Sequence, residues 1–190
     1  MQKIMQKIMQ KIMQKIMIPL AFVLTSIFFT SACKELDKLT QFEIDYSSTA
    51  KIGANSVINL PIDLLTPDIT TNSQSEFSSK NTNKDLIEAI KLLKLNLQIT
   101  SPTTQRFDFL KSIEVYIKAD GLGELKIAEK LDVPDTVGTD LSLDVKENDL
   151  APYIKKDKFS LRLKVVTDKT ITQEVNMKIN STIFVDAKLL

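Results

Sequence analysis

Apolar and polar residues alternate with a period of two along most of the chain after residue 40. The pattern recurs in segments 42–46, 93–99, 113–117, 141–145, 159–165 and 175–185. Because successive side chains of a strand point to opposite faces, this period predicts half-buried β-strands, with Tyr116, Arg162 and Lys164 facing outward. About eight such strands with turn residues between them favour a mainly β protein, an antiparallel β-sandwich with one or two short helices.

Three segments break the alternation. Residues 66–82 are rich in Ser, Thr and Asn and predict a long loop, with a short edge strand near Ile69 or Phe77. Residues 83–90 predict a short helix that begins at an Asn N-cap. Residues 148–154 predict a helical turn between two strands.

Turn chemistry adds three expectations. The Asp-Gly pair at 120–121 is a turn signal that leads into a returning strand at 122–127. Pro61 places a strand around residues 58–60 at an edge or end of a sheet, because proline cannot donate to a ladder. The long last strand is expected to bulge near Asn180.

The N-terminal residues have the pattern of a secretion signal. Four lysines precede an apolar run at residues 17–29, and Ser31 and Ala32 come directly before Cys33. A basic start, an apolar middle and small residues at the cut are the features of a signal peptide. The run is shorter than the roughly 20 residues that a membrane-spanning helix needs.

Thr30-Ser31-Ala32-Cys33 resembles the lipobox of bacterial lipoproteins, with Thr30 where that family usually has Leu. The resemblance implies cleavage between Ala32 and Cys33, diacylation of the Cys33 sulfur, for example by palmitate, and acylation of the new amine. Two or three acyl chains anchor a protein stably in a membrane. A buried free thiol, or a signal cut elsewhere, is the alternative.

With this cut the chain divides into three parts: a signal peptide at 1–32, a lipidated tether at 33–40 and a β-sandwich domain at 41–190. Residues 34–37, Lys-Glu-Leu-Asp, resemble the surface-export signal of some Gram-negative lipoproteins. That resemblance implies a lipid-anchored protein on the outer face of the outer membrane. A plain solvated tether, with the protein facing the periplasm, is the alternative.

The first sixteen residues repeat Met-Gln-Lys-Ile four times. At helical spacing this repeat suits a membrane-surface helix. It equally suits a short DNA repeat with an uncertain start codon, which we favour.

From Lys91 onward, the alternation in segments such as 93–97 and 109–113 resembles uncharacterised lipoprotein domains of the immunoglobulin-like sandwich kind. That resemblance implies a fold and carries over no functional residue.

Composition narrows the chemistry further. The chain has no His, no Trp and one Cys, so the commonest general base and metal ligand are missing. This predicts a protein that is not an enzyme and that binds no metal or cofactor. Removing the four lysines of residues 1–16 leaves 21 basic against 24 acidic residues. A weakly acidic chain with only two arginines predicts no nucleic-acid partner.

Three local features are candidates for a site. Asp132, Asp135 and Asp140 could bind calcium or act as acid and base, but their spacing matches no EF-hand loop and Asp is common in turns. Asp135-Thr136-Val137 resembles the O-glycosylation sequon of some Gram-negative secreted proteins, which implies modification of Thr136. Tyr116 could be a platform for a sugar, or it could pack on a neighbouring strand.

These features predict a non-enzymatic lipoprotein of the outer membrane or cell surface, with a structural, adhesive or partner-binding role. The expected partners are the membrane, through Cys33, and an envelope protein or a glycan. The alternative is a carbohydrate-binding accessory lipoprotein.

Overall fold

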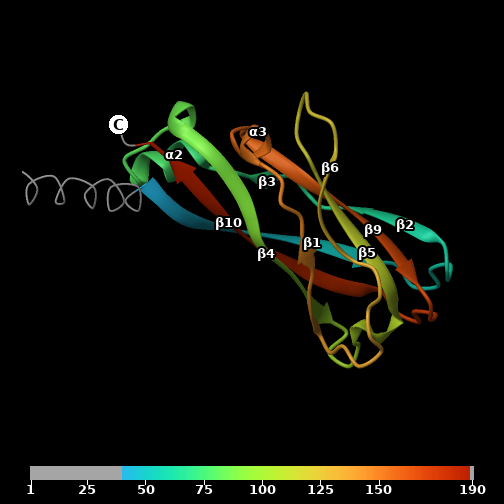
Figure 1. Ribbon diagram of the computed structural model, residues 1–190. Helices are drawn as coiled ribbons and strands as arrows, with labels where there is room; N and C mark the ends of the chain where they lie inside the picture. Colours follow the sequence, from blue (N-terminus) through green and yellow to red (C-terminus); the bar gives the residue numbers. More distant parts are fainter. Residues whose placement is uncertain (1–39, 189–190) are drawn as a thin grey trace, which may run out of the picture. The chain divides into compact units, whose positions relative to one another are not determined.

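The chain folds into two antiparallel sheets that pack face to face (Figure 1). The computed structural model describes residues 40–188, which form one compact unit. Within these residues, two short α-helices, α2 and α3, accompany ten strands. The predicted antiparallel β-sandwich is confirmed. The predicted signal peptide, the repeat and Cys33 lie outside the described residues.

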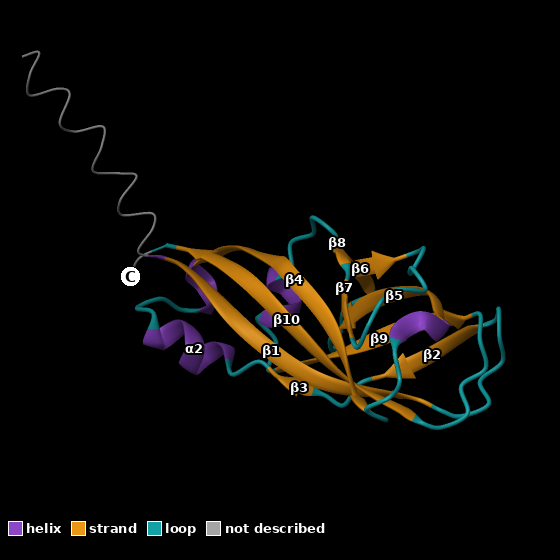
Figure 2. Ribbon diagram, turned by 90° about the horizontal axis from the view of Figure 1, so that it is seen from below, coloured by secondary structure: helices purple, strands orange, loops and turns teal. Residues whose placement is uncertain are grey.

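The first sheet, sheet A, has four strands in the order β1, β10, β4, β7. Their bounds are β1 Gln41–Ile52, β10 Val175–Ala187, β4 Ile87–Ser101 and β7 Asp140–Ser142. All three interfaces are antiparallel. The three long strands, β1, β10 and β4, run side by side in Figure 2. Most of their residues alternate between buried and exposed.

The second sheet, sheet B, has the order β2, β9, β5, β6, β8, and β3 extends its edge by pairing with β9. The bounds are β2 Pro61–Leu65, β3 Ile69–Thr70, β5 Leu110–Lys118, β6 Leu125–Lys130, β8 Asp144–Val145 and β9 Lys158–Thr167. Strand β2 begins at a proline and lies at an edge, as expected. It starts three residues later than the predicted segment 58–60.

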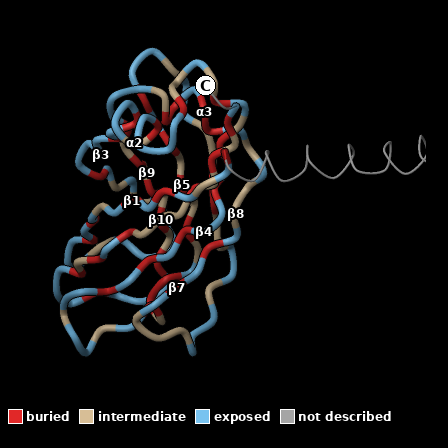
Figure 3. Tube along the Cα trace, turned by 90° about the vertical axis from the view of Figure 1, so that its left-hand side faces the viewer, coloured by how far each residue is buried: buried red, intermediate tan, exposed pale blue. Residues whose placement is uncertain are grey.

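The core lies between the two sheets. Figure 3 shows buried and exposed residues alternating along the strands. Leu97 of β4, Val185 of β10 and Leu163 of β9 are fully buried. Because each strand turns one face inward, this single layer of Ile, Leu and Val holds the sandwich together without a disulfide.

The predicted helix at 83–90 is wrong. Asn83 accepts hydrogen bonds from the backbone N–H groups of Asp85 and Leu86, so it does cap a turn. That turn is a 3-10 helix of three residues, η2 (Lys84–Leu86), and strand β4 begins at once. Pairing of twelve of the fifteen residues of β4 with β10 outweighs the local helical preference.

The polar segment 66–82 contains more structure than the predicted loop. A short edge strand was expected near Ile69 or Phe77, and the structure has it at Ile69. Phe77 instead lies in helix α2 (Ser73–Ser79), where it is fully buried and meets the ring of Phe42 edge-on at 6.2 Å. Five of the seven residues of α2 are Ser or Gln, so its sequence has a weak helical signal, and burial of Phe77 holds it in place.

The pairing of β4 with β10 shifts its register at three points, and the middle one changes which leucines are buried. The pairing with β10 shifts between Thr182 and Ile183, which leaves Leu93 exposed while Leu92 and Leu95 are buried. A bulge adds a residue to one strand and reverses the facing beyond it. The extra residue is Leu93, so the bulge belongs to β4, and the expected bulge of β10 near Asn180 is wrong: β10 pairs there with both β1 and β4 without a shift.

The remaining elements are close to expectation. The Asp-Gly turn is present, with Gly121 at φ 72°, and strand β6 follows at Leu125. The helical turn is α3 (Ala151–Ile154). The Asp149 carboxylate accepts hydrogen bonds from the backbone N–H groups of Ala151 and of Ile90, which ties α3 to β4. A 3-10 turn, η3 (Phe107–Phe109), precedes β5.

Candidate functional site

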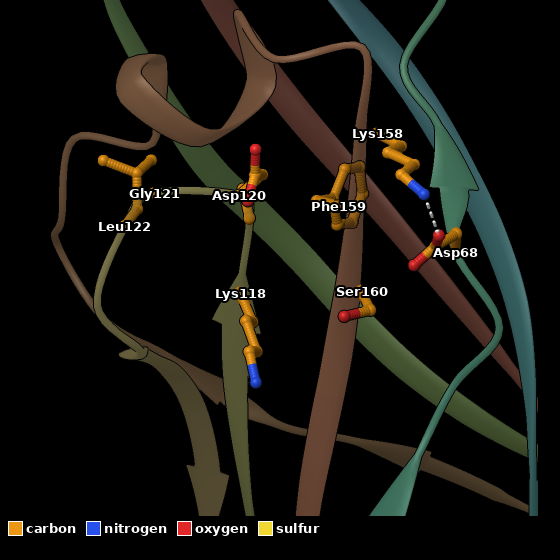
Figure 4. A pocket seen from close by; sticks show the side chains of 9 residues that line it. Asp68, Lys118, Asp120, Gly121, Leu122, Lys158, Phe159 and Ser160 are labelled. Carbon is orange, nitrogen blue, oxygen red and sulfur yellow. Dashed lines mark hydrogen bonds and ion pairs between the residues drawn. The ribbon is translucent and has the colours of Figure 1, made fainter.

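An open cavity of about 320 Å³ lies at one end of sheet B (Figure 4). It is bordered by the end of β5, the turn that follows, the start of β9 and the residue before β3. The polar side chains that line it are Asp68, Lys118, Asp120, Lys158 and Ser160. We call this the end cleft.

The backbone positions these groups. Lys118 and Ser160 are register partners on β5 and β9, so their side chains emerge side by side from the outer face of sheet B. The turn needs the left-handed conformation of Gly121, which a side chain would strain. Leu122 donates its backbone N–H to the Ala119 carbonyl and closes that turn.

The end cleft has two cations and two anions. Lys158 forms an ion pair with Asp68 at 2.6 Å, and this contact raises the pKa of Lys158. No hydrogen bond to a described residue is made by the Lys118 ammonium, the Asp120 carboxylate or the Ser160 hydroxyl. Three polar side chains therefore keep hydrogen-bonding capacity for a polar ligand or for water.

A network of ion pairs covers the neighbouring outer face of sheet B. Arg162 of β9 contacts Asp63 at 2.6 Å and Glu124 at 2.8 Å, and its guanidinium lies 4.2 Å from the centre of the Tyr116 ring. Tyr116 donates its hydroxyl to Glu114 at 2.5 Å. These contacts join β2, β9, β5 and the turn before β6.

The network continues across β6 through Lys126. This ammonium contacts Glu114 at 2.8 Å and Glu129 at 3.1 Å, and Lys146 also pairs with Glu129. The opposed carboxylates Glu114 and Glu129 are register partners, so the shared cation offsets their repulsion.

The pKa values follow from these contacts. Hydrogen bonds from Lys126 and Tyr116 lower the pKa of Glu114 to about 2. Lys146 and Lys126 lower the pKa of Glu129, and Arg162 lowers that of Glu124. A carboxyl group that acts as a general acid needs a raised pKa, so these three carboxylates suit ion pairing and do not suit proton donation at neutral pH.

The three tyrosines do not form an open sugar platform. Tyr116 faces outward as predicted, and the guanidinium of Arg162 already lies over its ring. Tyr46 and Tyr153 are buried, and their hydroxyls donate to the carbonyls of Thr71 and Gly123. Burial raises the pKa of Tyr46.

The predicted glycosylation site is on the surface. Thr136 is exposed in a turn closed by a hydrogen bond from the Val137 N–H to the Pro134 carbonyl, and Arg106 donates to the Thr136 carbonyl at 3.4 Å. The hydroxyl is therefore accessible, and its modification stays a prediction.

Two of the three aspartates of the same loop, Asp135 and Asp140, have separate partners. Asp135 pairs with Lys169 at 2.7 Å, and Asp140 accepts from the Thr139 hydroxyl at 2.8 Å. Within residues 40–188, no group of three or more Asp, Glu, His or Cys side chains is arranged to hold a metal ion.

None of the helices in residues 40–188 has the length and apolar character needed to span a membrane. The predicted lipidation and cleavage residues, Cys33 and Ala32, are outside the described range.

A second cleft, of about 420 Å³, lies between α2 and the turn before β9. Its hydroxyl groups are largely engaged within the chain. Thr71 donates to the Lys156 carbonyl at 2.7 Å, and Ser75 donates to the Asn72 carbonyl at 2.9 Å. The only charged side chain that lines this second cleft, Asp157, is paired with Lys84 at 3.2 Å, whereas Lys118 and Asp120 of the end cleft form no ion pair with a described residue. The end cleft is therefore the better candidate site.

Sequence reasoning found neither the end cleft nor the ion-pair network. The pattern predicted that Arg162 and Lys164 face outward, and both do. It did not pair them with Asp63 and Glu114, because cross-strand partners depend on the strand order and register. The signal available in the sequence was the alternation of opposite charges at outward positions of β5, β6 and β9.

The comparisons with known proteins add little about function. No family model and no curated protein matches the chain. The BFDV capsid protein, crystallised as a decamer, is 13% identical over 78% of this chain and 98% of its own, with a TM-score of 0.41. The CpGH89CBM32-5 domain of Clostridium perfringens, in complex with GalNAc-beta-1,3-galactose, is 10% identical over 76% and 97%, with a TM-score of 0.35.

The C-terminal domain of a chitobiase from Bacteroides fragilis is 11% identical over 69% of this chain and 66% of its own, with a TM-score of 0.29. All three TM-scores are below 0.5, so the likeness is one of general strand arrangement. It carries no argument about a ligand or an activity.

Proposed function

We propose that the chain is a lipid-anchored, non-catalytic binding module of the outer membrane, held through Cys33 and exposed at the cell surface. The observation that carries the proposal is the sequence of residues 17–33, where an apolar run and two small residues lead to the only cysteine. Six residues then separate Cys33 from Thr40, where the compact unit begins. An extended tether of that length reaches roughly 20 Å.

The chemistry of the described surface supports a binding role over a catalytic one. The carboxylates of the sheet B network are ionised and paired, and the chain has no His to act as a base. The end cleft has Lys118, Asp120 and Ser160 available for hydrogen bonds in an open cavity. Such a site fits an exposed polar segment of an envelope protein.

Protease shaving of intact cells tests the location. We expect the wild-type protein to be digested from outside, and a Cys33→Ala variant to lose both its membrane association and its labelling by palmitate. A palmitate-labelled wild type that is digested only after lysis would place the protein on the periplasmic side. A Cys33→Ala variant that stays anchored would refute the lipid anchor.

A glycan ligand is the second candidate function. The end cleft favours it, because hydroxyl-rich ligands are recognised by a few convergent donors and acceptors. The buried or covered tyrosines count against a stacking platform. A glycan array with the wild type, with Lys118→Ala and with Lys94→Ala as a matched lysine on sheet A would decide. Binding lost only in Lys118→Ala supports a glycan, and no binding by the wild type refutes it.

A further inference from the structure

Strand β1 is an unusually long open edge. In the described part of the chain it pairs on one side only, with β10, through twelve consecutive register partners and without a bulge. Residues 41–52 make no backbone hydrogen bond to described residues outside that pairing. One row of backbone donors and acceptors along β1 is therefore open.

The other edges are short. Strands β7, β8 and β3 have three, two and two residues, and β2 has five and begins at Pro61. Proteins protect edges by short strands, proline, bulges or charged side chains, since an open edge is a template for another strand. Strand β1 has none of the first three, and its exposed charged residues, Glu43, Asp45 and Lys51, carry both signs.

We propose that β1 pairs with β1 of a second copy of this chain, antiparallel, about a two-fold axis at Ser47. The two four-stranded sheets then form one continuous sheet of eight strands. This inference concerns residues 41–52 alone and does not depend on the lipid anchor or on the end cleft.

The pleat restricts how two copies of β1 can pair. Outward residues must face outward residues, so an antiparallel self-pairing must be centred on a residue and not between two residues. From the bounds Gln41–Ile52, centres at Tyr46 and at Ser47 each pair eleven residues of each strand. These two registers overlap more than the other allowed ones.

Charge distinguishes the two registers. Glu43, Asp45, Ser47, Thr49 and Lys51 are the exposed outward residues in the middle of β1. With the centre at Ser47, each Glu43 faces Lys51 of the second copy. With the centre at Tyr46, each Glu43 faces Thr49, and no opposite charges meet.

The Ser47 register also places small side chains at the axis. Ser47 faces its own copy, and Asp45 faces Thr49 of the second copy, so no large groups collide on the outward face. Directly opposed charged pairs stabilise a sheet, and here the symmetry supplies two.

Cysteine cross-linking of the full chain tests the register. Directly opposed residues of antiparallel strands have Cα atoms about 4.5–5.5 Å apart, a distance that a disulfide spans. We expect a Ser47→Cys variant to form a disulfide dimer under mild oxidation. Asn96→Cys, exposed on β4 at the middle of the same sheet, is the matched control and should not cross-link. Equal cross-linking of both variants overturns the proposal.

Charge reversal tests the pairing independently, with the dimer dissociation constant measured by sedimentation. Either Glu43→Lys or Lys51→Glu should raise that constant by about tenfold, and the double variant should restore it. Glu174→Gln removes the intrachain partner of Lys51, 3.2 Å away, and should leave dimerisation unchanged.

Failure of the double variant to recover overturns the Ser47 register. Two results together would overturn self-pairing: the wild type is monomeric, and the Ser47→Cys variant cross-links only to a different protein. They would assign the edge to a strand of that other protein.

Discussion

The outer faces of the two sheets differ in how their polar groups are satisfied. On sheet B, ion pairs join β2, β9, β5, β6 and β8, with Arg162 and Lys126 each contacting two carboxylates. On sheet A, the row across the four strands is uncharged: Ser47, Asn180, Asn96 and Ser142.

This difference between the outer faces suggests that one sheet serves stability and the other serves binding. The charges of sheet B neutralise one another, so that face has little to offer a partner beyond the end cleft. The outward amides of sheet A, such as Asn96 and Gln98, are exposed and make no hydrogen bond to a described side chain. The open edge of β1 belongs to the same sheet, so association should involve sheet A and surface stabilisation should involve sheet B.

The largest effect on stability is expected from a residue on the buried face of sheet A. Leu95→Ala should lower the free energy of unfolding by about 2–5 kcal/mol, because Leu95 is 1% exposed and its truncation leaves a cavity. Leu93→Ala should change it by less than about 0.5 kcal/mol, since Leu93 is 39% exposed at the bulge. Urea unfolding measures both, and similar losses for the two variants would refute the β4 register.

A smaller effect is expected on the outer face of sheet B. Arg162→Ala removes two ion pairs and the guanidinium over Tyr116, and should cost about 1–2 kcal/mol. Asn96→Ala on sheet A is the matched control and should stay within about 0.5 kcal/mol of the wild type. If the two variants unfold at the same urea concentration, the ion pairs of sheet B do not add to the free energy of unfolding.

The smallest effect depends on pH. The pKa of Glu114 is about 2 in the folded protein against 4.5 ordinarily, so its contribution is complete above pH 4.5 and is lost as pH falls toward 2. Glu114→Gln should therefore cost about 1 kcal/mol at neutral pH and almost nothing near pH 2.

Unfolding curves across this pH range, with Glu43→Gln on sheet A as control, measure the effect. A cost of Glu114→Gln that is independent of pH would show that its ion pairs contribute nothing.

Sequence pattern was sufficient for much of the architecture. The period of two identified the strands and the facing of Tyr116, Arg162 and Lys164, because side-chain direction in a strand is a local property. It was also sufficient for the Asp-Gly turn, which depends on the backbone freedom of Gly121.

It failed where distant contacts outweigh local preference. Residues 83–90 favour a helix locally, but pairing with β10 extends β4 to Ile87. Helix α2 exists because Phe77 is buried against the ring of Phe42, thirty-five positions earlier in the chain.

The candidate site follows the same division. Residue order alone predicted a signal that ends at Cys33, which stays a prediction, and the fold class, which is confirmed, since each depends on neighbours in the chain or on a repeating period. The end cleft, the ion pairs of Arg162 and the open edge of β1 depend on which strands are adjacent and in which register. Strand order and register are decided only in the tertiary structure, because they are set by burial of one whole sheet face against the other.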